Sequence, residues 1–181
     1  MLSIDDIRSG LAELARRLDA LGIEVSIYLV GGAAVALTVR PDRQLTDDVD
    51  SWINHHGDEG LRTSVFDVVA EIGRGRPGFP SNWLNDNAAQ FIPESVTGDP
   101  ADWTPFLAHG TVTIFAARPE VLLAMKLHAS RGRRDLPDLP ALLAASNVTS
   151  SSGAIAVFER FYPHDEIKAR AVVWLEAHFA G

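Results

Sequence analysis

The sequence predicts an α/β (α+β) fold in which a small mixed β-sheet is followed by a helical C-terminal half. Patterns of helical and strand period alternate over residues 1–118, whereas only helical patterns follow over residues 119–181. With 46% apolar residues among 181, the chain can also build a substantial core. We therefore expect an α/β core over 1–118 and a helical lobe packed on it over 119–181.

Charge and composition narrow the class of protein. The formal net charge is −8, so the surface as a whole repels polyanions and any contact with nucleic acid needs a local basic patch. The chain has no cysteine, which excludes disulfides and thiolate metal sites. The first residues are acidic, unlike a signal peptide, and no apolar run approaches the roughly 20 residues of a membrane span. We expect a cytoplasmic protein without a membrane partner.

The N-terminal segment from Ser3 to Leu21 is predicted to form an amphipathic helix. Ser3 and Asp6 resemble a capping box, and Gly22 suits the end of the helix. The apolar stripe has alternating spacings of three and four and consists of Ile4, Ile7, Leu11, Leu14, Leu18 and Leu21.

A strand is predicted next, over residues 23–30, and it runs directly into Gly31 and Gly32. A short helix follows over residues 33–39, so the glycines lie at a strand-to-helix junction. Glycine lets the backbone come close to an anion, and a helix N-terminus attracts one, so this junction is a candidate phosphate site. A simple tight turn is the alternative.

The stretch from Asp48 to Ile53 alternates polar and apolar residues with the period of a strand. Asp48 and Asp50 are expected on one face, roughly 7 Å apart, with Val49 on the other. Such a pair of carboxylates suits Mg²⁺, although a solvated acidic edge is the simpler interpretation. Asp47 is expected to be a bystander.

The rest of the chain completes the predicted order of elements. A helix is expected over residues 61–72, and a loop rich in glycine, proline and asparagine follows, in which Trp83 and Phe91 are expected to serve as anchors. A last strand is predicted over residues 110–117. Helices are predicted over residues 119–130, 137–145, 153–161 and 164–179.

Two blocks of the sequence together resemble the nucleotidyltransferases of the AbiEii and MenT toxin group. The first block carries a GG...R..T.D(I/V)D signature, and the second, PEVLLAMKLHASRGRRDLPDLPALL, is similar to a helix pair of that group. The C-terminal FERFYPHDEIKARAVVWLE also looks like the helical end of the group, so the resemblance covers the chain from about residue 27 onward. The matching residues are Gly31, Gly32, Ala33, Ala34, Leu37, Arg43, Thr46, Asp48, Val49, Asp50, Lys126, Arg134, Asp135 and Asp138.

The resemblance implies a minimal polymerase-β-like nucleotidyltransferase, which transfers a nucleoside monophosphate from an NTP to an acceptor. Asp48 and Asp50 would hold Mg²⁺ as its ligands, and Lys126, which has apolar neighbours in the sequence, would neutralise triphosphate charge. The implied nucleotide-binding residues are Gly31, Gly32, Ala33, Arg43, Thr46, Lys126 and Asp135, and the implied catalytic residues are Asp48, Asp50, Lys126 and Asp138.

The resemblance also implies partners: a tRNA 3′ end as the acceptor, and a separately encoded antitoxin. Arg131, Arg133 and Arg134 form a basic cluster that suits RNA phosphates, although such arginines are often only solvated. Two other functions stay open. One is a nucleotidyltransferase that modifies a small molecule such as an antibiotic, and the other is a catalytically silent protein that keeps the fold for binding.

One departure from the superfamily pattern concerns its third carboxylate. That carboxylate usually lies on a later strand, but the strand TVTIFAA contains no acid. Either Asp135 or Asp138 substitutes, or the substrate holds a second metal ion; acids that balance nearby arginines are the simpler interpretation of both residues. A two-metal enzyme, a one-metal enzyme and a decayed enzyme are therefore all compatible with the sequence.

Overall fold

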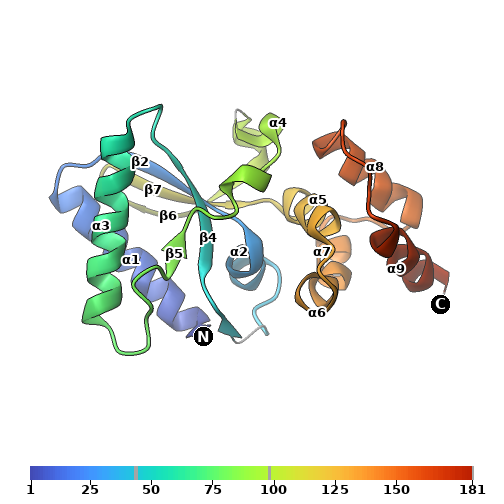
Figure 1. Ribbon diagram of the computed structural model, residues 1–181, viewed down its shortest axis with the longest axis horizontal. Coiled ribbons are helices and arrows are strands. Elements are labelled where there is room, and N and C mark those ends of the chain that lie inside the picture. Colours follow the sequence, from blue (N-terminus) through green and yellow to red (C-terminus); the bar gives the residue numbers. More distant parts are fainter. Residues whose placement is uncertain (43–44, 98, 181) are drawn as a thin grey trace. The chain divides into compact units, whose positions relative to one another are not determined.

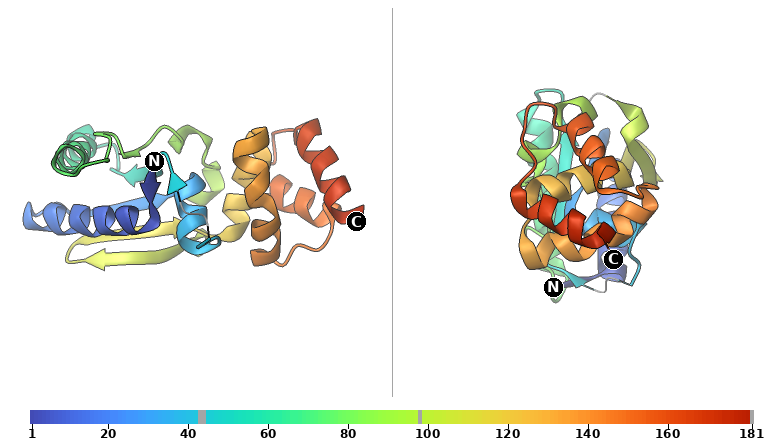
Figure 2. Two further views of the ribbon diagram at one scale, coloured as in Figure 1. Left: turned by 90° about the horizontal axis from the view of Figure 1, so that it is seen from below. Right: turned by 90° about the vertical axis from the view of Figure 1, so that its right-hand side faces the viewer.

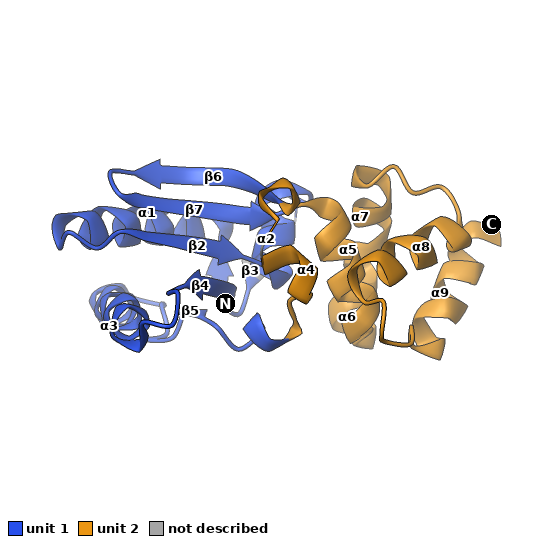
Figure 3. Cartoon of the chain, turned by 90° about the horizontal axis from the view of Figure 1, so that it is seen from above, with its two compact units in different colours: residues 1–90, 103–117 blue, residues 91–102, 118–181 orange. Residues whose placement is uncertain are grey.

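The computed structural model describes residues 1–42, 45–97 and 99–180, and the chain forms two compact units. Unit 1 consists of Met1–Gln90 and Trp103–Ala117, and unit 2 of Phe91–Asp102 and Arg118–Gly181 (Figure 3). The short segment 91–102 thus belongs with the C-terminal helices.

Unit 1 combines helices with a main sheet and a small two-stranded sheet, and Figure 1 labels its helices and the main-sheet strands. Its helices are α1 (Ile4–Ala20), α2 (Gly31–Thr38) and α3 (Glu59–Gly75). Its strands are β1 (Leu2–Ser3), β2 (Val25–Leu29), β3 (Leu45–Thr46), β4 (Val49–Asn54), β5 (Leu84–Asn85), β6 (Trp103–His109) and β7 (Val112–Ala117). A 3-10 turn, η1 (Ala89–Phe91), follows at the change from unit 1 to unit 2.

The main sheet has five strands in the order β5-β4-β2-β7-β6, and it is mixed as predicted. β2 pairs antiparallel with β4 and parallel with β7, whereas β4 pairs parallel with β5. A separate two-stranded pairing joins β1 to β3. The central position of β2 places its C-terminal end, where α2 begins, between the strand that follows Asp48 and the strand that ends at Ala117.

One face of the main sheet is covered by helices. Buried and half-buried residues alternate along β2 and β4, because successive side chains of a strand point to opposite faces. α1 contacts β6, β7 and α3, and it runs along the strands of the sheet (Figure 2). The predicted capping box is present at its start, where the Ser3 hydroxyl accepts from the Asp6 N–H and the Asp6 carboxylate accepts from the Ser3 N–H.

Four strands, the short β1 and β3 and the main-sheet strands β5 and β6, are absent from the order that the sequence predicts. β6 is an edge strand, and its pairing with β7 is irregular between Pro105 and Leu107. Proline cannot donate to a strand ladder, so a proline inside a short run argues against a strand unless the strand lies at an edge. β5 has only two residues, which is too short for any period to be recognised.

Unit 2 is helical in the part of the chain that the structure describes. Its elements are α4 (Glu94–Thr97), η2 (Pro100–Asp102), α5 (Pro119–Ala129), α6 (Gly132–Asp135), η3 (Leu136–Asp138), α7 (Leu139–Ala145), α8 (Ser151–Phe161) and α9 (Ala169–Ala180). α5 packs against α7 and α8, and α8 against α9. The last helix begins at Ala169 and not at residue 164, because a turn in which the Asp165 N–H donates to the Tyr162 carbonyl precedes it. Among the described residues, no helix is long and apolar enough to cross a membrane.

Candidate functional site in unit 1

The two predicted metal ligands lie at the start of β4. Asp48 directly precedes the strand and Asp50 is its second residue, and both are half-buried, whereas Val49 between them is fully buried. The alternation expected from the sequence therefore holds at these three positions. Asp47, the predicted bystander, is exposed.

The glycine pair forms the first turn of α2, and it approaches Asp50 closely. The Gly31 backbone has φ of +67°, and a Cβ built on this residue would lie 2.4 Å from Asp50 Oδ2. The adjoining backbone is also joined to the strand, since the Val30 N–H donates to the Asp50 carbonyl over 3.0 Å. Only glycine fits here, because the position needs both a left-handed backbone and the absence of a side chain.

The N-terminus of α2 is the candidate anion site. Val30 occupies the N-cap position and makes no side-chain hydrogen bond to the helix. Gly31 and Gly32 are half-buried, whereas Ala33 and the four residues after it are buried. The first-turn N–H groups and the positive end of the helix dipole therefore lie beside a carboxylate, an arrangement that attracts a phosphate together with a cation.

Substitution of Gly31 by alanine should test this close approach. We expect a backbone cost of about 1–2 kcal/mol from the left-handed conformation and displacement of the Asp50 carboxylate, and the nucleotide transfer that the resemblance implies should fall about 10²-fold. Gly22→Ala is the matched control, because Gly22 has φ of +70° but no atom within 4 Å of an added Cβ. It should lower the thermal midpoint and leave transfer unchanged. Equal effects of the two substitutions on transfer would contradict the role of Gly31.

Asp48 is held by two neighbours, of which the resemblance included only Thr46. The Thr46 hydroxyl donates to the Asp48 carbonyl over 3.1 Å, so Thr46 shapes the entry into β4. The Asn85 amide Nδ2 donates to Asp48 Oδ2 over 3.1 Å. The sequence offered no pattern that assigns Asn85 to this site, because it lies 37 residues away on a strand of two residues.

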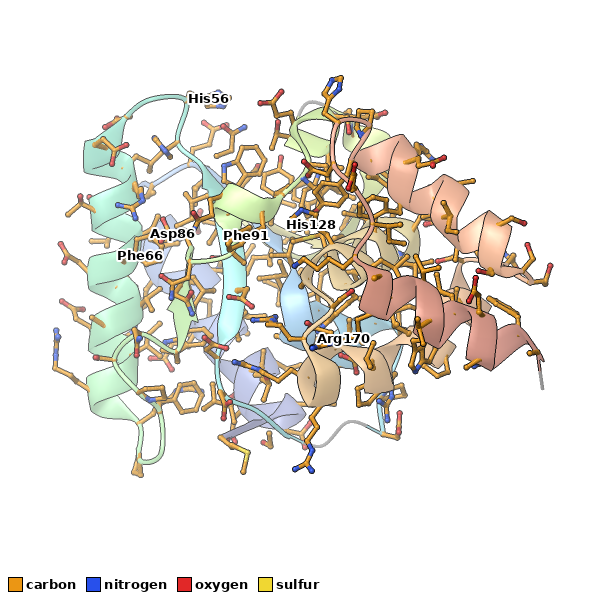
Figure 4. The ribbon with its side chains drawn as sticks, turned by 45° about the vertical axis from the view of Figure 1, so that its right-hand side comes forward. His56, Phe66, Asp86, Phe91, His128 and Arg170 are labelled. Atoms are coloured by element: carbon orange, nitrogen blue, oxygen red, sulfur yellow. The ribbon has the colours of Figure 1, made fainter. Side chains whose placement is uncertain are left out.

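The segment around β5 is anchored to α3. Trp83 is fully buried, and its indole N–H donates to the Val69 carbonyl over 3.1 Å, which confirms the expected anchor. Arg62 of α3 donates to Asp86 over 2.7 Å and also lies over the Phe66 ring; Asp86 and Phe66 are labelled in Figure 4. The second expected anchor is wrong, since Phe91 is 52% exposed. Its main-chain carbonyl, however, accepts a hydrogen bond from the Tyr162 hydroxyl.

A row of aromatic side chains follows Asp50 on the face of the sheet opposite to the buried residues of β4. Tyr28 pairs in register with Trp52 on β4 and with Phe115 on β7. The ring centroids are 4.8 Å apart for Tyr28 and Trp52 and 5.0 Å apart for Tyr28 and Phe115. Aromatic pairs across neighbouring strands stabilise a sheet, so this row supports the strand that carries Asp50.

Residues of unit 2

Three further predicted site residues, Lys126, Asp135 and Asp138, meet in a buried ionic network of unit 2. Lys126 of α5 is 6% exposed, and its Nζ lies 2.9 Å from Asp135 Oδ1 and 3.2 Å from Asp138 Oδ2. Asp135 also accepts from the backbone N–H of Arg131 over 2.8 Å and from its guanidinium over 2.9 Å. The structure thus shows Asp135 paired with a nearby arginine, as in the simpler interpretation of this residue.

The network keeps Asp135 ionised. Burial acts to raise the pKa of Asp135, but the hydrogen bonds from Arg131 and the charge of Lys126 outweigh it and hold this pKa below its ordinary value. Because the folded-state pKa is lowered, the carboxylate stabilises the fold above the ordinary carboxyl pKa. This contribution is lost as the pH falls through the lowered value.

The predicted site residues thus fall into two groups. Gly31, Gly32, Ala33, Thr46, Asp48 and Asp50 lie in unit 1, and Lys126, Asp135 and Asp138 lie in unit 2. Arg43, the remaining predicted nucleotide-binding residue, lies outside the described residues. Within the described ranges, no group of three or more histidine, cysteine, aspartate or glutamate side chains is placed to hold a metal ion. The roles of all these residues stay predictions.

Comparisons with known proteins identify the fold. No protein-family model matches the chain, and no curated protein does so either. The crystal structure of an antigenic nucleotidyltransferase-like protein from Paracoccidioides brasiliensis is similar, with a TM-score of 0.51 and 18% sequence identity over 99% of each chain. The resemblance to the AbiEii and MenT toxins in particular stays a prediction. The chain therefore has the fold of a nucleotidyltransferase-like protein.

Proposed function

We propose that the protein is a Mg²⁺-dependent nucleotidyltransferase that transfers a nucleoside monophosphate from an NTP to a hydroxyl acceptor. The observation that carries the proposal is the contact between the start of α2 and Asp50, since Gly31 leaves room for the Asp50 carboxylate at a helix N-terminus. An anion site and a carboxylate pair then occupy one place on the sheet. The fold likeness to a nucleotidyltransferase-like protein supports the same function.

The residues present fit a magnesium ion. Asp48 and Asp50 supply carboxylate oxygens, the ligands that Mg²⁺ prefers, and both are half-buried, so water can complete the coordination. When bound, Mg²⁺ would neutralise negative charge on the substrate phosphates. The N–H groups of Gly31 and Gly32 would hold phosphate oxygens, and the pair of aspartates would fix the orientation of the triphosphate.

The proposed reaction is a single displacement at the α-phosphorus. The acceptor hydroxyl oxygen forms a bond to the α-phosphorus, and the bond from that phosphorus to the oxygen bridging to the β-phosphorus breaks. Pyrophosphate leaves, and the proton of the hydroxyl passes to water. The task of the chain is to align the two oxygens and to stabilise the charge that builds up on the phosphate.

For the acceptor we propose the 3′ end of a tRNA, with the protein acting as the toxin of a toxin-antitoxin pair. The support for this is the resemblance of the two sequence blocks and the exposure of Arg133 and Arg134, which present positive charge beside the buried Asp135. The net charge of −8 favours a small-molecule acceptor, so both acceptors belong in the same assay.

A second candidate function, nucleotide binding without transfer, is favoured by one observation. Lys126 is already paired with two aspartates, so its charge is balanced within unit 2. A protein of this kind would bind an NTP tightly and release it unchanged.

The test is a transfer assay with the wild-type protein. Each radiolabelled NTP is incubated with Mg²⁺ and either total tRNA or an aminoglycoside, and the labelled product is separated from the NTP. We expect a Mg²⁺-dependent labelled tRNA. Growth arrest on expression in bacteria would support the toxin role, and a labelled aminoglycoside would move the acceptor to small molecules. Tight NTP binding with no product would overturn transfer and establish the silent binding function.

A further inference from the structure

Asn85 is a buried polar residue whose side-chain amide is fixed in one orientation. It is 7% exposed, its Nδ2 donates to Asp48 Oδ2, and its Oδ1 accepts from the Asn87 N–H over 3.0 Å. An amide side chain can be flipped when its neighbours do not distinguish oxygen from nitrogen. Here a backbone donor faces the oxygen and a carboxylate faces the nitrogen, so only one orientation satisfies both.

The backbone of Asn85 is held as firmly as its side chain. Asn85 pairs with Asp50 in the β4–β5 ladder, and the buried Ser51 hydroxyl donates to the Asn85 carbonyl over 3.0 Å. At the start of the same ladder, where Val49 pairs with Leu84, the Val49 N–H donates to the Trp83 carbonyl over 2.7 Å. Asn85 is therefore a rigid part of the sheet, and it is joined to α3 through the buried Trp83.

Asp48, in contrast, precedes the strand, so the ladder does not determine the direction of its side chain. We propose that Asn85 is a positioning residue that orients the Asp48 carboxylate for the metal ion, an inference that rests on the proposed function. The hydrogen bond uses Asp48 Oδ2 and leaves Oδ1 to take the cation. A carboxylate that is already oriented loses less side-chain freedom when the cation binds.

Asn85 acts on the metal ion through Asp48 and not as a ligand itself. The atom of Asn85 that could coordinate a cation is Oδ1, and this atom is turned toward the Asn87 N–H. Groups that orient a metal ligand typically change metal affinity by about 10–100-fold when they are removed. Loss of Asn85 should therefore weaken metal binding without abolishing it, in contrast to loss of Asp48.

The experiment measures Mg²⁺ and Mn²⁺ binding by calorimetry on the metal-free full-length protein, without any nucleotide. We expect Asn85→Ala to raise the metal dissociation constant about 10-fold or more. In transfer assays, it should raise the Mg²⁺ concentration for half-maximal rate far more than it lowers the rate at saturating Mg²⁺. Thermal unfolding in EDTA reports stability separately.

Two control variants separate positioning from folding. Ser51→Ala removes a buried hydrogen bond between the same two strands but leaves the bond from Asn85 to Asp48, so it should lower stability and keep metal affinity within about twofold of wild type. Asn87→Ala changes an exposed side chain and retains the backbone N–H, so it should match wild type. If Ser51→Ala weakens metal binding as much as Asn85→Ala, or if Asn85→Ala binds metal like wild type, the inference is wrong.

Metal binding and nucleotide transfer together distinguish the positioning role of Asn85 from the proposed enzyme activity. A wild-type protein that binds Mg²⁺ but transfers no nucleotide contradicts the enzyme and still allows Asn85 to be judged by metal affinity alone. A wild-type protein that binds no Mg²⁺ and transfers no nucleotide contradicts both. A wild-type protein that binds and transfers, with an Asn85→Ala variant that does so equally well, contradicts only the positioning role.

Discussion

Replacement of Asp50 by asparagine is expected to lower Mg²⁺-dependent nucleotide transfer by at least about 10³-fold. The substitution keeps the shape of the side chain but removes one of the two carboxylates at the start of β4, and a hard cation binds a neutral amide much more weakly than a carboxylate. A loss of about 4 kcal/mol of transition-state stabilisation corresponds to this factor. The measurement is the transfer rate at saturating Mg²⁺ and NTP.

Asp47→Asn is the matched control for this prediction. Asp47 is exposed and directly precedes Asp48, so the control removes the same charge from a neighbouring position without changing a proposed metal ligand. It should retain wild-type transfer. Thermal unfolding of both variants in EDTA should agree within a few degrees with wild type. An Asp50→Asn variant that transfers nucleotide at the wild-type rate would contradict the role of this residue as a metal ligand.

Replacement of Lys126 by methionine is expected to destabilise the fold by about 3–5 kcal/mol. Removing the cation leaves Asp135 with Arg131 as its cationic partner and takes Lys126 away from the buried Asp138, and loss of one partner of a buried ion pair is strongly unfavourable. For a chain of this size the expected fall in the thermal midpoint is roughly 10 °C. Lys168→Met is the control, because the exposed Lys168 donates a hydrogen bond to the Ala129 carbonyl in the same unit and is not part of the buried network of Lys126.

A double variant distinguishes a structural role of Lys126 from a role in binding the triphosphate. Combining Lys126→Met with Asp138→Asn removes one charge of each sign, so part of the lost stability should return. If Lys126 also contacts the triphosphate, the double variant keeps a KM for the NTP above that of Asp138→Asn alone, even though part of its stability has returned. Recovery of both stability and KM would show that the lysine serves only the buried network.

The sequence was sufficient to place the two aspartates and the glycine pair of unit 1, because local patterns encode their positions, whereas their roles stay predictions. The alternation around Val49 placed Asp48 and Asp50 correctly, and the glycine pair correctly marked the change from β2 to α2. Asn85 could not be found in this way, since its contact with Asp48 spans 37 residues and depends on which strands become neighbours. Pairing of distant strands is a tertiary property that no local pattern contains.

The contacts of Lys126 with Asp135 and Asp138 could not be predicted from the sequence for a different reason. The chain turns after α5 at Ser130, which has a left-handed backbone with φ of +46°. Glycine is the usual residue at such a helix end, so serine gave no signal that the following acids return toward Lys126. The edge strand β6 was also absent from the prediction, and it contains Pro105, a residue type that strands tolerate only at the edge of a sheet. The number of strands therefore came out too low, although the class of fold was predicted correctly.

Unit 1 consists of two separate stretches of the chain, and this affects how it folds during protein synthesis. The central strand β2 is made early, yet its parallel partner β7 comes much later in the chain, since Leu29 pairs with Ala116. Until residue 117 has left the ribosome, one edge of β2 has no strand beside it, and unpaired strand edges are templates for aggregation. Nascent chains that stop within segment 91–102, before β6 and β7 are made, therefore carry the carboxylate pair on an incomplete sheet and should depend on chaperones until the hairpin closes it.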